Sequence, residues 1–193
     1  MNHRLVATLF CLLLLACNQT PVEFRNTDLT AATFGRQLML RDHNGRNRSI
    51  GDFRDKVILI FFGYTSCPDI CPTTLARLAE VMKELGSEAE RVQVLFVSLD
   101  PERDTKKRLK EFVPWFHPSF PGLYGDAAQT KAVSEEFRVF SSRKEVGSQM
   151  RYVLDHSSGA YVYDPAGRLR LYVRDSVGVD DFASDIRQLF AGQ

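Results

Sequence analysis

Two cysteines lie four positions apart, at Cys67 and Cys71, and a proline follows each of them. The segment after the pair has the pattern of an amphipathic helix, and the dipole at a helix N-terminus favours thiolate over thiol. Thiolate is the form of cysteine that attacks disulfides and binds metals. A spacing of four places both sulfurs on the same side of one helical turn. The pair can therefore share a metal ion or close a disulfide.

Buried cysteines also occur simply as small hydrophobic residues. Here the two prolines and the polar Asp69 between the cysteines favour a shaped turn with a function. Redox-active pairs in thioredoxins have two residues between the cysteines, whereas this pair has three. The wider spacing favours metal binding and leaves thiol–disulfide exchange open.

Two thiolates favour Cu(I), zinc or iron–sulfur clusters. Structural zinc and clusters take four ligands, and the chain has too few cysteines for them. Copper in its Cu(I) state is satisfied by two or three ligands. The third would most naturally be an imidazole, which means one of four histidines.

The histidines differ in their surroundings. His3 lies in an N-terminal leader. His43 lies in a predicted hairpin turn and His117 at a predicted helix end, where both are most simply polar surface residues. His156 lies in a predicted loop just before a late hairpin, and in a thioredoxin-like fold that loop can come alongside the cysteine loop. Placement favours His156 over His117 as a ligand, and a capping or surface role for His156 stays open.

Residues 1–16 have the pattern of a signal peptide. The apolar run at 5–16 is shorter than the roughly 20 residues that a membrane-spanning helix needs. The residues that end at Cys17 resemble a bacterial lipobox, with Leu15 where a small residue is usual, so ordinary secretion is the alternative. We expect an exported, periplasm-facing lipoprotein that acyl chains on Cys17 anchor to a membrane, with residues 17–33 as its tether.

The composition is that of an ordinary globular protein. The chain has 193 residues, of which 44% are hydrophobic, and a formal net charge of +1. This length predicts one domain, at 34–193, whose core needs no disulfide staple. Since Cys11 leaves with the signal peptide and Cys17 is acylated, only Cys67 and Cys71 remain for chemistry. The balanced charge argues against a nucleic-acid partner.

Hydrophobic patterns predict the elements that position the pair. Unbroken apolar runs at 57–62 and 92–99 are typical of strands buried on both faces of a parallel sheet. The cysteine loop at 63–72 joins the first run to an amphipathic helix that ends at Gly86. The other expected elements are a hairpin at 37–50 around Asn44-Gly45, helices at 105–115, 127–137 and 180–190, a short strand at 123–124, and a second hairpin at 160–173.

This order predicts an α/β fold with a parallel-centred sheet, helices on both faces and added β-hairpins. A cysteine pair at the C-terminal end of the first central strand, opening the next helix, is the thioredoxin-like arrangement.

Three segments, in this order, resemble the signature of the SCO/SenC family of copper proteins: FGYTSCPDICPTTL at 62–75, SLDPERDT at 98–105 and DHS at 155–157. The resemblance covers about residues 34–190. It implies a thioredoxin-like fold, membrane attachment and a role in assembling the binuclear copper site of cytochrome c oxidase. It also implies that Cys67, Cys71 and His156 are the copper ligands.

The chain departs from the family pattern in two places. Ser66 stands where many relatives have a histidine. That histidine is not among the family's usual three ligands, so the copper ligands are unchanged, while the redox properties of the pair can differ. The stretch at 124–126 is less typical of the family and leaves partner recognition open.

Two aspartates stand beside these motifs. Asp100 either caps the loop and helix that follow it or lies near the metal loop as a supporting or partner-docking group. Asp155 either orients the imidazole of His156 through a hydrogen bond or shapes the turn. Tyr64 and Trp115 are interpreted as packing residues.

The leading hypothesis is a monomeric copper metallochaperone that binds one copper ion, as Cu(I) or Cu(II), and passes it to the copper-site subunit of cytochrome c oxidase. Copper donor proteins would supply the ion. The alternative is a thiol–disulfide oxidoreductase that uses Cys67 and Cys71 to reduce the acceptor's cysteines before metallation. A thiol peroxidase is weaker, since no clear peroxidatic cysteine is present. His156 separates the first two hypotheses, because an oxidoreductase does not need it.

Overall fold

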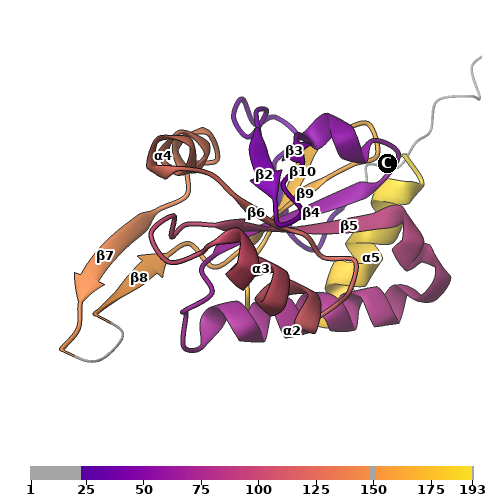
Figure 1. Ribbon diagram of the computed structural model, residues 1–193. Coiled ribbons are helices and arrows are strands. Elements are labelled where there is room, and N and C mark those ends of the chain that lie inside the picture. The colour runs from indigo at the N-terminus through magenta and orange to yellow at the C-terminus, as the bar shows by residue number, and fades with distance from the viewer. Residues whose placement is uncertain (1–22, 148–150, 193) are drawn as a thin grey trace, which may run out of the picture.

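The computed structural model of the chain describes residues 23–147 and 151–192 (Figure 1). The predicted signal peptide, Cys17 and the first part of the tether lie outside these residues. Among the helices that the structure describes, none has the length and apolar character needed to cross a bilayer. The lipid anchor therefore stays a prediction.

The main sheet has the strand order β1-β10-β9-β4-β5-β6-β2-β3. At its centre, β4 pairs parallel with β5 and β5 pairs parallel with β6, while the flanking pairs are antiparallel. This confirms the predicted parallel-centred α/β sheet. The strands are β1 (Thr27–Asp28), β2 (Leu40–Asp42), β3 (Asn47–Arg48), β4 (Val57–Gly63), β5 (Val92–Ser98), β6 (Gly122–Tyr124), β9 (Ala160–Tyr163) and β10 (Leu169–Val173).

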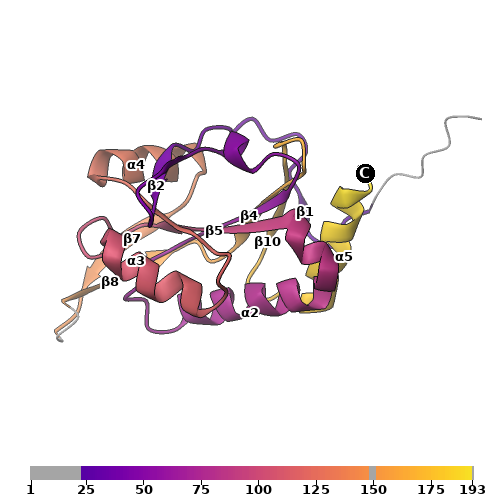
Figure 2. The same ribbon diagram turned by 45° about the vertical axis from the view of Figure 1, so that its right-hand side comes forward.

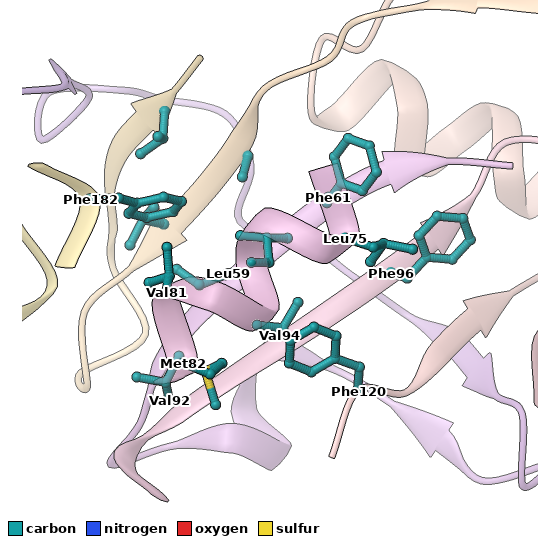
Figure 3. Close-up of a cluster of buried hydrophobic side chains, with 14 of the residues drawn as sticks. Leu59, Phe61, Leu75, Val81, Met82, Val92, Val94, Phe96, Phe120 and Phe182 are labelled. Atoms are coloured by element: carbon teal, nitrogen blue, oxygen red, sulfur yellow. The ribbon is translucent and has the colours of Figure 1, made fainter. Parts of the chain in front are cut away.

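Strand β4 lies between two hydrophobic clusters because its side chains alternate between the faces of the sheet. Its odd-numbered residues from Val57 to Phe61 join one cluster, and its even-numbered residues from Ile58 to Phe62 join the other. Figure 3 shows Leu59 and Phe61 beside Leu75 in the first cluster. Burial on both faces explains why this strand reads as an unbroken apolar run.

Helices cover both faces of the sheet (Figure 2). Buried residues of α2 and α5 pack in the first cluster with Leu109 of α3, and Val133 of α4 packs in the second. The helices are α2 (Ile70–Leu85), α3 (Lys106–Phe112), α4 (Ala127–Glu136) and α5 (Val179–Phe190), with short 3-10 helices η2 (Ile50–Phe53), η3 (Gly86–Arg91) and η4 (Val113–Trp115). These helices and both predicted hairpins confirm the expected elements, with small shifts at their ends.

A further antiparallel hairpin, β7 (Ser141–Glu145) with β8 (Tyr152–His156), forms a separate two-stranded sheet. It projects from one end of the molecule (Figure 1, orange). The sequence did not predict it, because β7 is almost entirely exposed and carries no apolar alternation. The expectation that His156 lies in a loop is therefore wrong, since His156 is the last residue of β8.

The N-terminal segment from residue 23 is held on the domain. Strand β1 pairs with β10, and the backbone N–H groups of Arg25 and Asn26 both donate to the fully buried carboxylate of Asp185 at 3.0 Å. Part of the segment expected to serve as a tether thus contributes to the sheet.

Two single-residue expectations are wrong. His43 is buried rather than on the surface, and its Nδ1 atom accepts a hydrogen bond of 3.1 Å from the backbone N–H of Gly122. Trp115 is not a packing residue, because 81% of its surface is exposed. It contacts Phe116 edge to face, with the ring centres 5.3 Å apart.

Candidate metal and thiol site

The cysteine pair lies where β4 ends and α2 begins. Cys67 is in the connecting loop, and Cys71 is in the first turn of α2, which starts at Ile70. The last residue of β4, Gly63, leaves room for the second sulfur. A Cβ atom on Gly63 would lie 2.8 Å from the Cys71 Sγ atom, which is closer than two such atoms can pack.

The third predicted residue comes to the same place from β8. The Sγ atom of Cys71 lies 3.4 Å from the Nε2 atom of His156. The three potential ligand atoms of Cys67, Cys71 and His156 all lie within 4.8 Å of one another. Both cysteines are free thiols; Cys71 is fully buried, while Cys67 and His156 are half-buried. The three residues are therefore close enough to form a metal site.

The two ring nitrogens of His156 have different surroundings. Its Nδ1 atom lies 2.8 Å from the backbone carbonyl of Ser157. Because a carbonyl only accepts hydrogen bonds, Nδ1 carries a proton, and Nε2 is the ring nitrogen that faces the sulfurs. The rings of Tyr64 and Phe61 contact the imidazole edge to face, with centres 5.7 and 6.4 Å away.

Strand β8 is attached to the domain beside the cysteine loop. The backbone N–H of Leu154 donates to the hydroxyl of Tyr64 at 3.2 Å, and the hydroxyl of Tyr152 donates to Asp100 at 2.7 Å. The guanidinium of Arg103 donates to the backbone carbonyl of Tyr152 at 3.0 Å. Tyr64 thus has a positioning role, since it contacts the imidazole and also fixes the strand that carries it. Its burial raises the pKa of the phenol.

The two predicted supporting aspartates have different surroundings. Asp100 is buried, and it binds Arg103 and Tyr152 rather than a potential metal ligand. Asp155 is exposed and forms an ion pair with Lys144 across the β7–β8 hairpin. The group bonded to the Nδ1 atom of His156 is the carbonyl of Ser157. Sequence reasoning could not identify this group, because every residue has a carbonyl.

Sequence reasoning also missed the role of Asp104, which lies just before α3. The cap of α3 is Thr105, whose side chain accepts from the Arg108 N–H. Asp104 is buried, and it accepts hydrogen bonds from the Thr65 N–H at 3.1 Å and from the Ser98 hydroxyl at 2.6 Å. Burial raises the pKa of its carboxyl. Asp104 therefore fixes the cysteine loop to the end of β5.

The pKa values of the two thiols are shifted in opposite directions. A hydrogen bond from Cys71 is the largest cause that lowers the pKa of Cys67, to about 3, and bonds from His156 and the backbone N–H groups of Asp69 and Cys71 add to it against the effect of burial. The same interaction with Cys67 raises the pKa of Cys71, and burial raises it further. Cys67 is thus an accessible thiolate, and Cys71 is a protonated thiol behind it.

These features define a class: a thioredoxin-like domain with a dithiol and an imidazole at the C-terminal end of its central parallel strands. The chain matches the model of the SCO1/SenC family over residues 26–191. The chain belongs to this family, as its three motifs predicted.

Curated relatives include the mitochondrial SCO2 homologue of Bos taurus, which is 36% identical over 170 residues. That match covers 86% of this chain and 64% of the bovine protein, so the chain spans less than two thirds of that relative. The SCO2-like protein of Rickettsia felis is also 36% identical, over 89% of this chain and 85% of that protein.

Solved structures show the same fold. Copper-bound ScoI of Bradyrhizobium japonicum is 34% identical, with a TM-score of 0.74 over 81% of this chain and 99% of that one. Apo Sco1 of Thermus thermophilus is 34% identical, with a TM-score of 0.75 over 89% of this chain and 99% of that one. Copper-bound yeast Sco1 is 32% identical, with a TM-score of 0.70 over 80% and 88%.

The unequal thiols predict selective alkylation. In the metal-free, reduced protein, iodoacetamide at pH 6 should modify Cys67 within minutes, because this pH lies above its pKa of about 3 and the sulfur is accessible. Cys71 should react at least about tenfold more slowly, since it is buried and protonated. Peptide mapping by mass spectrometry measures both rates. In Cys67→Ser the Cys71 thiol should stay protected, and equal rates for the two thiols in the wild-type protein would contradict this assignment.

Proposed function

We propose that this chain carries one copper ion on Cys67, Cys71 and His156 and passes it to the copper-site subunit of cytochrome c oxidase. The observation that supports this most strongly is the convergence of two sulfurs and one imidazole nitrogen within 4.8 Å. Within the described ranges, no other group of histidine, cysteine or acidic residues is arranged in this way.

The donor set suits copper in both kind and spacing. Soft thiolates and imidazole favour copper, whereas hard cations prefer oxygen ligands. Three ligands at about 2.0–2.3 Å from an ion lie roughly 3.7–4.0 Å from one another. In the structure, the ligand atoms of Cys71 and His156 are 3.4 Å apart, and all three ligand atoms lie within 4.8 Å of one another. Small side-chain rotations would bring them to the distances that a bound ion requires.

The position of the site permits transfer to another protein. Cys67 and His156 open on a hollow of about 350 Å³ that Tyr64 and the Cys67–Ile70 segment also line. Three protein ligands leave room on the ion for an incoming ligand of the acceptor. Transfer is then a ligand exchange: an acceptor thiolate or imidazole binds the ion, Cys67 or His156 leaves, and no electrons are transferred.

The comparisons support this proposal, since relatives of 32–34% identity are described as copper-bound. We further propose that copper donor proteins load the site and that the chain acts as an exported, membrane-anchored monomer. The lipobox-like sequence at Cys17 supports the anchor, which would keep the site near a membrane-embedded oxidase.

Loss of the imidazole should weaken copper binding while both thiols stay in place. In His156→Ala, copper affinity should fall by about 100-fold or more, because even groups that only orient a ligand contribute 10–100-fold. Competition against a copper chelator measures the affinity. His117→Ala is the matched control, since His117 lies on Phe120 and bonds Ser119. Equal affinities for wild type and His156→Ala would exclude His156 as a ligand.

A second function, reduction of an acceptor disulfide, is favoured by the unequal exposure of the two thiols. The accessible Cys67 sulfur would attack one sulfur of the acceptor disulfide and release the other. Cys71 would then attack Cys67, form the Cys67–Cys71 disulfide and release the second acceptor sulfur, which takes up the proton of Cys71. Two electrons pass from this chain to the acceptor, and no metal takes part.

This second function is tested with metal-free protein and a synthetic peptide that has one internal disulfide. The reduced protein should reduce about one peptide disulfide per molecule, and His156→Ala should do the same, because exchange needs only the two thiols. Cys71→Ser should stop at a mixed disulfide. Mass spectrometry detects each product, and failure of the wild-type protein to reduce the peptide under these conditions would remove this candidate.

A further inference from the structure

A cavity rich in arginine lies beside the cysteine loop. It has a volume of about 510 Å³, and Ser66, the residue before Cys67, lines it. The side chains around it come from the cysteine loop, from α3, from the β7–β8 hairpin and from the loop after β5. They are Ser66, Glu102, Arg103, Arg108, Arg143, Arg151 and Tyr152.

Several of these guanidinium groups are fixed in place. Arg108 donates to the hydroxyls of Thr65 at 2.6 Å and Ser66 at 3.1 Å. Arg103 and Arg143 stack on Tyr152, with their central carbons 3.6 and 3.7 Å from the ring centre. Fixed guanidinium groups lose little entropy when they bind a carboxylate, which they can hold through two parallel hydrogen bonds.

The cavity has an excess of positive charge. Arg103 is paired with Asp100, and Arg143 is paired with both Glu102 and Glu145. Arg108 bonds to neutral hydroxyls, and Arg151 is exposed. Neither Arg108 nor Arg151 forms an ion pair within residues 23–147 and 151–192. Two guanidinium groups thus remain to bind an anion that the described part of the chain does not supply.

An apolar groove lies on the other side of Arg108. Its volume is about 530 Å³, and it reaches the cysteine loop at Thr65 and Pro72. Three aromatic residues, Phe112, Trp115 and Phe116, line it together with Arg108 and Glu111. The 81% exposure of Trp115 is unusual for so large an apolar side chain.

We propose that the arginine cavity and the apolar groove together form a docking surface for an acidic segment of the acceptor protein that also carries an apolar side chain. This inference rests on the proposed function, because it concerns the protein that meets the Cys67 sulfur. Charge complementarity identifies the carboxylates. The adjoining aromatic groove favours a polypeptide over a small anion, since arginine and aromatic residues together are typical of protein interfaces.

The docking surface brings a partner to the cysteine pair, because it includes residues that flank the pair in the sequence. Ser66 precedes Cys67, and Pro72 follows Cys71. A segment held there presents its neighbouring residues to the accessible sulfur. Positive charge around the surface also accelerates the encounter with an acidic partner, an effect that salt screens.

The chain carries its own reporter for this test. Trp115 is the single tryptophan of the sequence and lines the groove, so its fluorescence reports what binds there. Full-length, metal-free protein is titrated with a short synthetic peptide of glutamates around one leucine. The comparison probes are the same peptide with glutamines, the glutamate peptide with serine for leucine, and inorganic phosphate alone.

The glutamate–leucine peptide should change Trp115 emission in a saturable way and should bind more weakly as salt is added. Arg151→Glu should weaken binding by about fivefold or more, the size expected when a favourable charge pair becomes a repulsive one. Arg108→Gln should also weaken it. Arg54→Glu makes the same change in net charge at the other end of β4, roughly 20 Å from the cysteine loop. This variant should bind the peptide as the wild type does.

Two results would overturn the proposal. One is the absence of a saturable change with the glutamate–leucine peptide, and the other is an equal response to the glutamine peptide or to phosphate alone. The test is independent of copper, because it uses metal-free protein. Copper binding of Arg151→Glu, measured separately, should equal that of the wild type, so failure of the docking surface and failure of the copper-carrier function are distinguishable.

Discussion

The 3.4 Å approach of the Cys71 sulfur to the His156 imidazole joins segments that lie 85 positions apart in the chain. Local structure positions only Cys71, because the first turn of α2 places its sulfur beside Gly63. His156 is positioned by β8. Hydrogen bonds to Tyr64, Asp100 and Arg103 attach this strand, which is not part of the main sheet. Metal ligation requires ligand atoms placed within a few tenths of an ångström, so the site depends on these tertiary contacts.

The cysteine loop is stabilised by a polar network under its surface. The Thr65 hydroxyl bonds to the buried Asp104 carboxylate and accepts from Arg108, and Asp104 in turn accepts from Ser98 at the end of β5. Such a network fixes a loop more firmly than packing alone, because each member loses hydrogen bonds if the loop moves. One network thus connects the loop that carries Cys67 with Arg108, whose guanidinium group belongs to the proposed docking surface.

The sequence predicted the elements whose physical cause is local. The apolar runs of β4 and β5, the turn at Asn44-Gly45 and the dithiol at the start of α2 all follow from residue types and spacing. Strand β7 could not be predicted, because its polar residues pair with β8 outside the core. His156 was favoured by its placement and assigned by family resemblance, since no pattern along the chain shows that it meets Cys71. The burial of His43 depends on contacts with β6 that sequence spacing does not reveal.

X-ray absorption at the copper edge of the copper-loaded protein is the sharpest test of the proposed copper site, because it reports the number and type of ligands together. We expect one copper ion per chain with two sulfur neighbours at about 2.2–2.3 Å and one imidazole nitrogen at about 2.0 Å. The imidazole contribution should disappear in His156→Ala. A spectrum with sulfur neighbours alone, or one that His156→Ala leaves unchanged, would contradict a site formed by Cys67, Cys71 and His156.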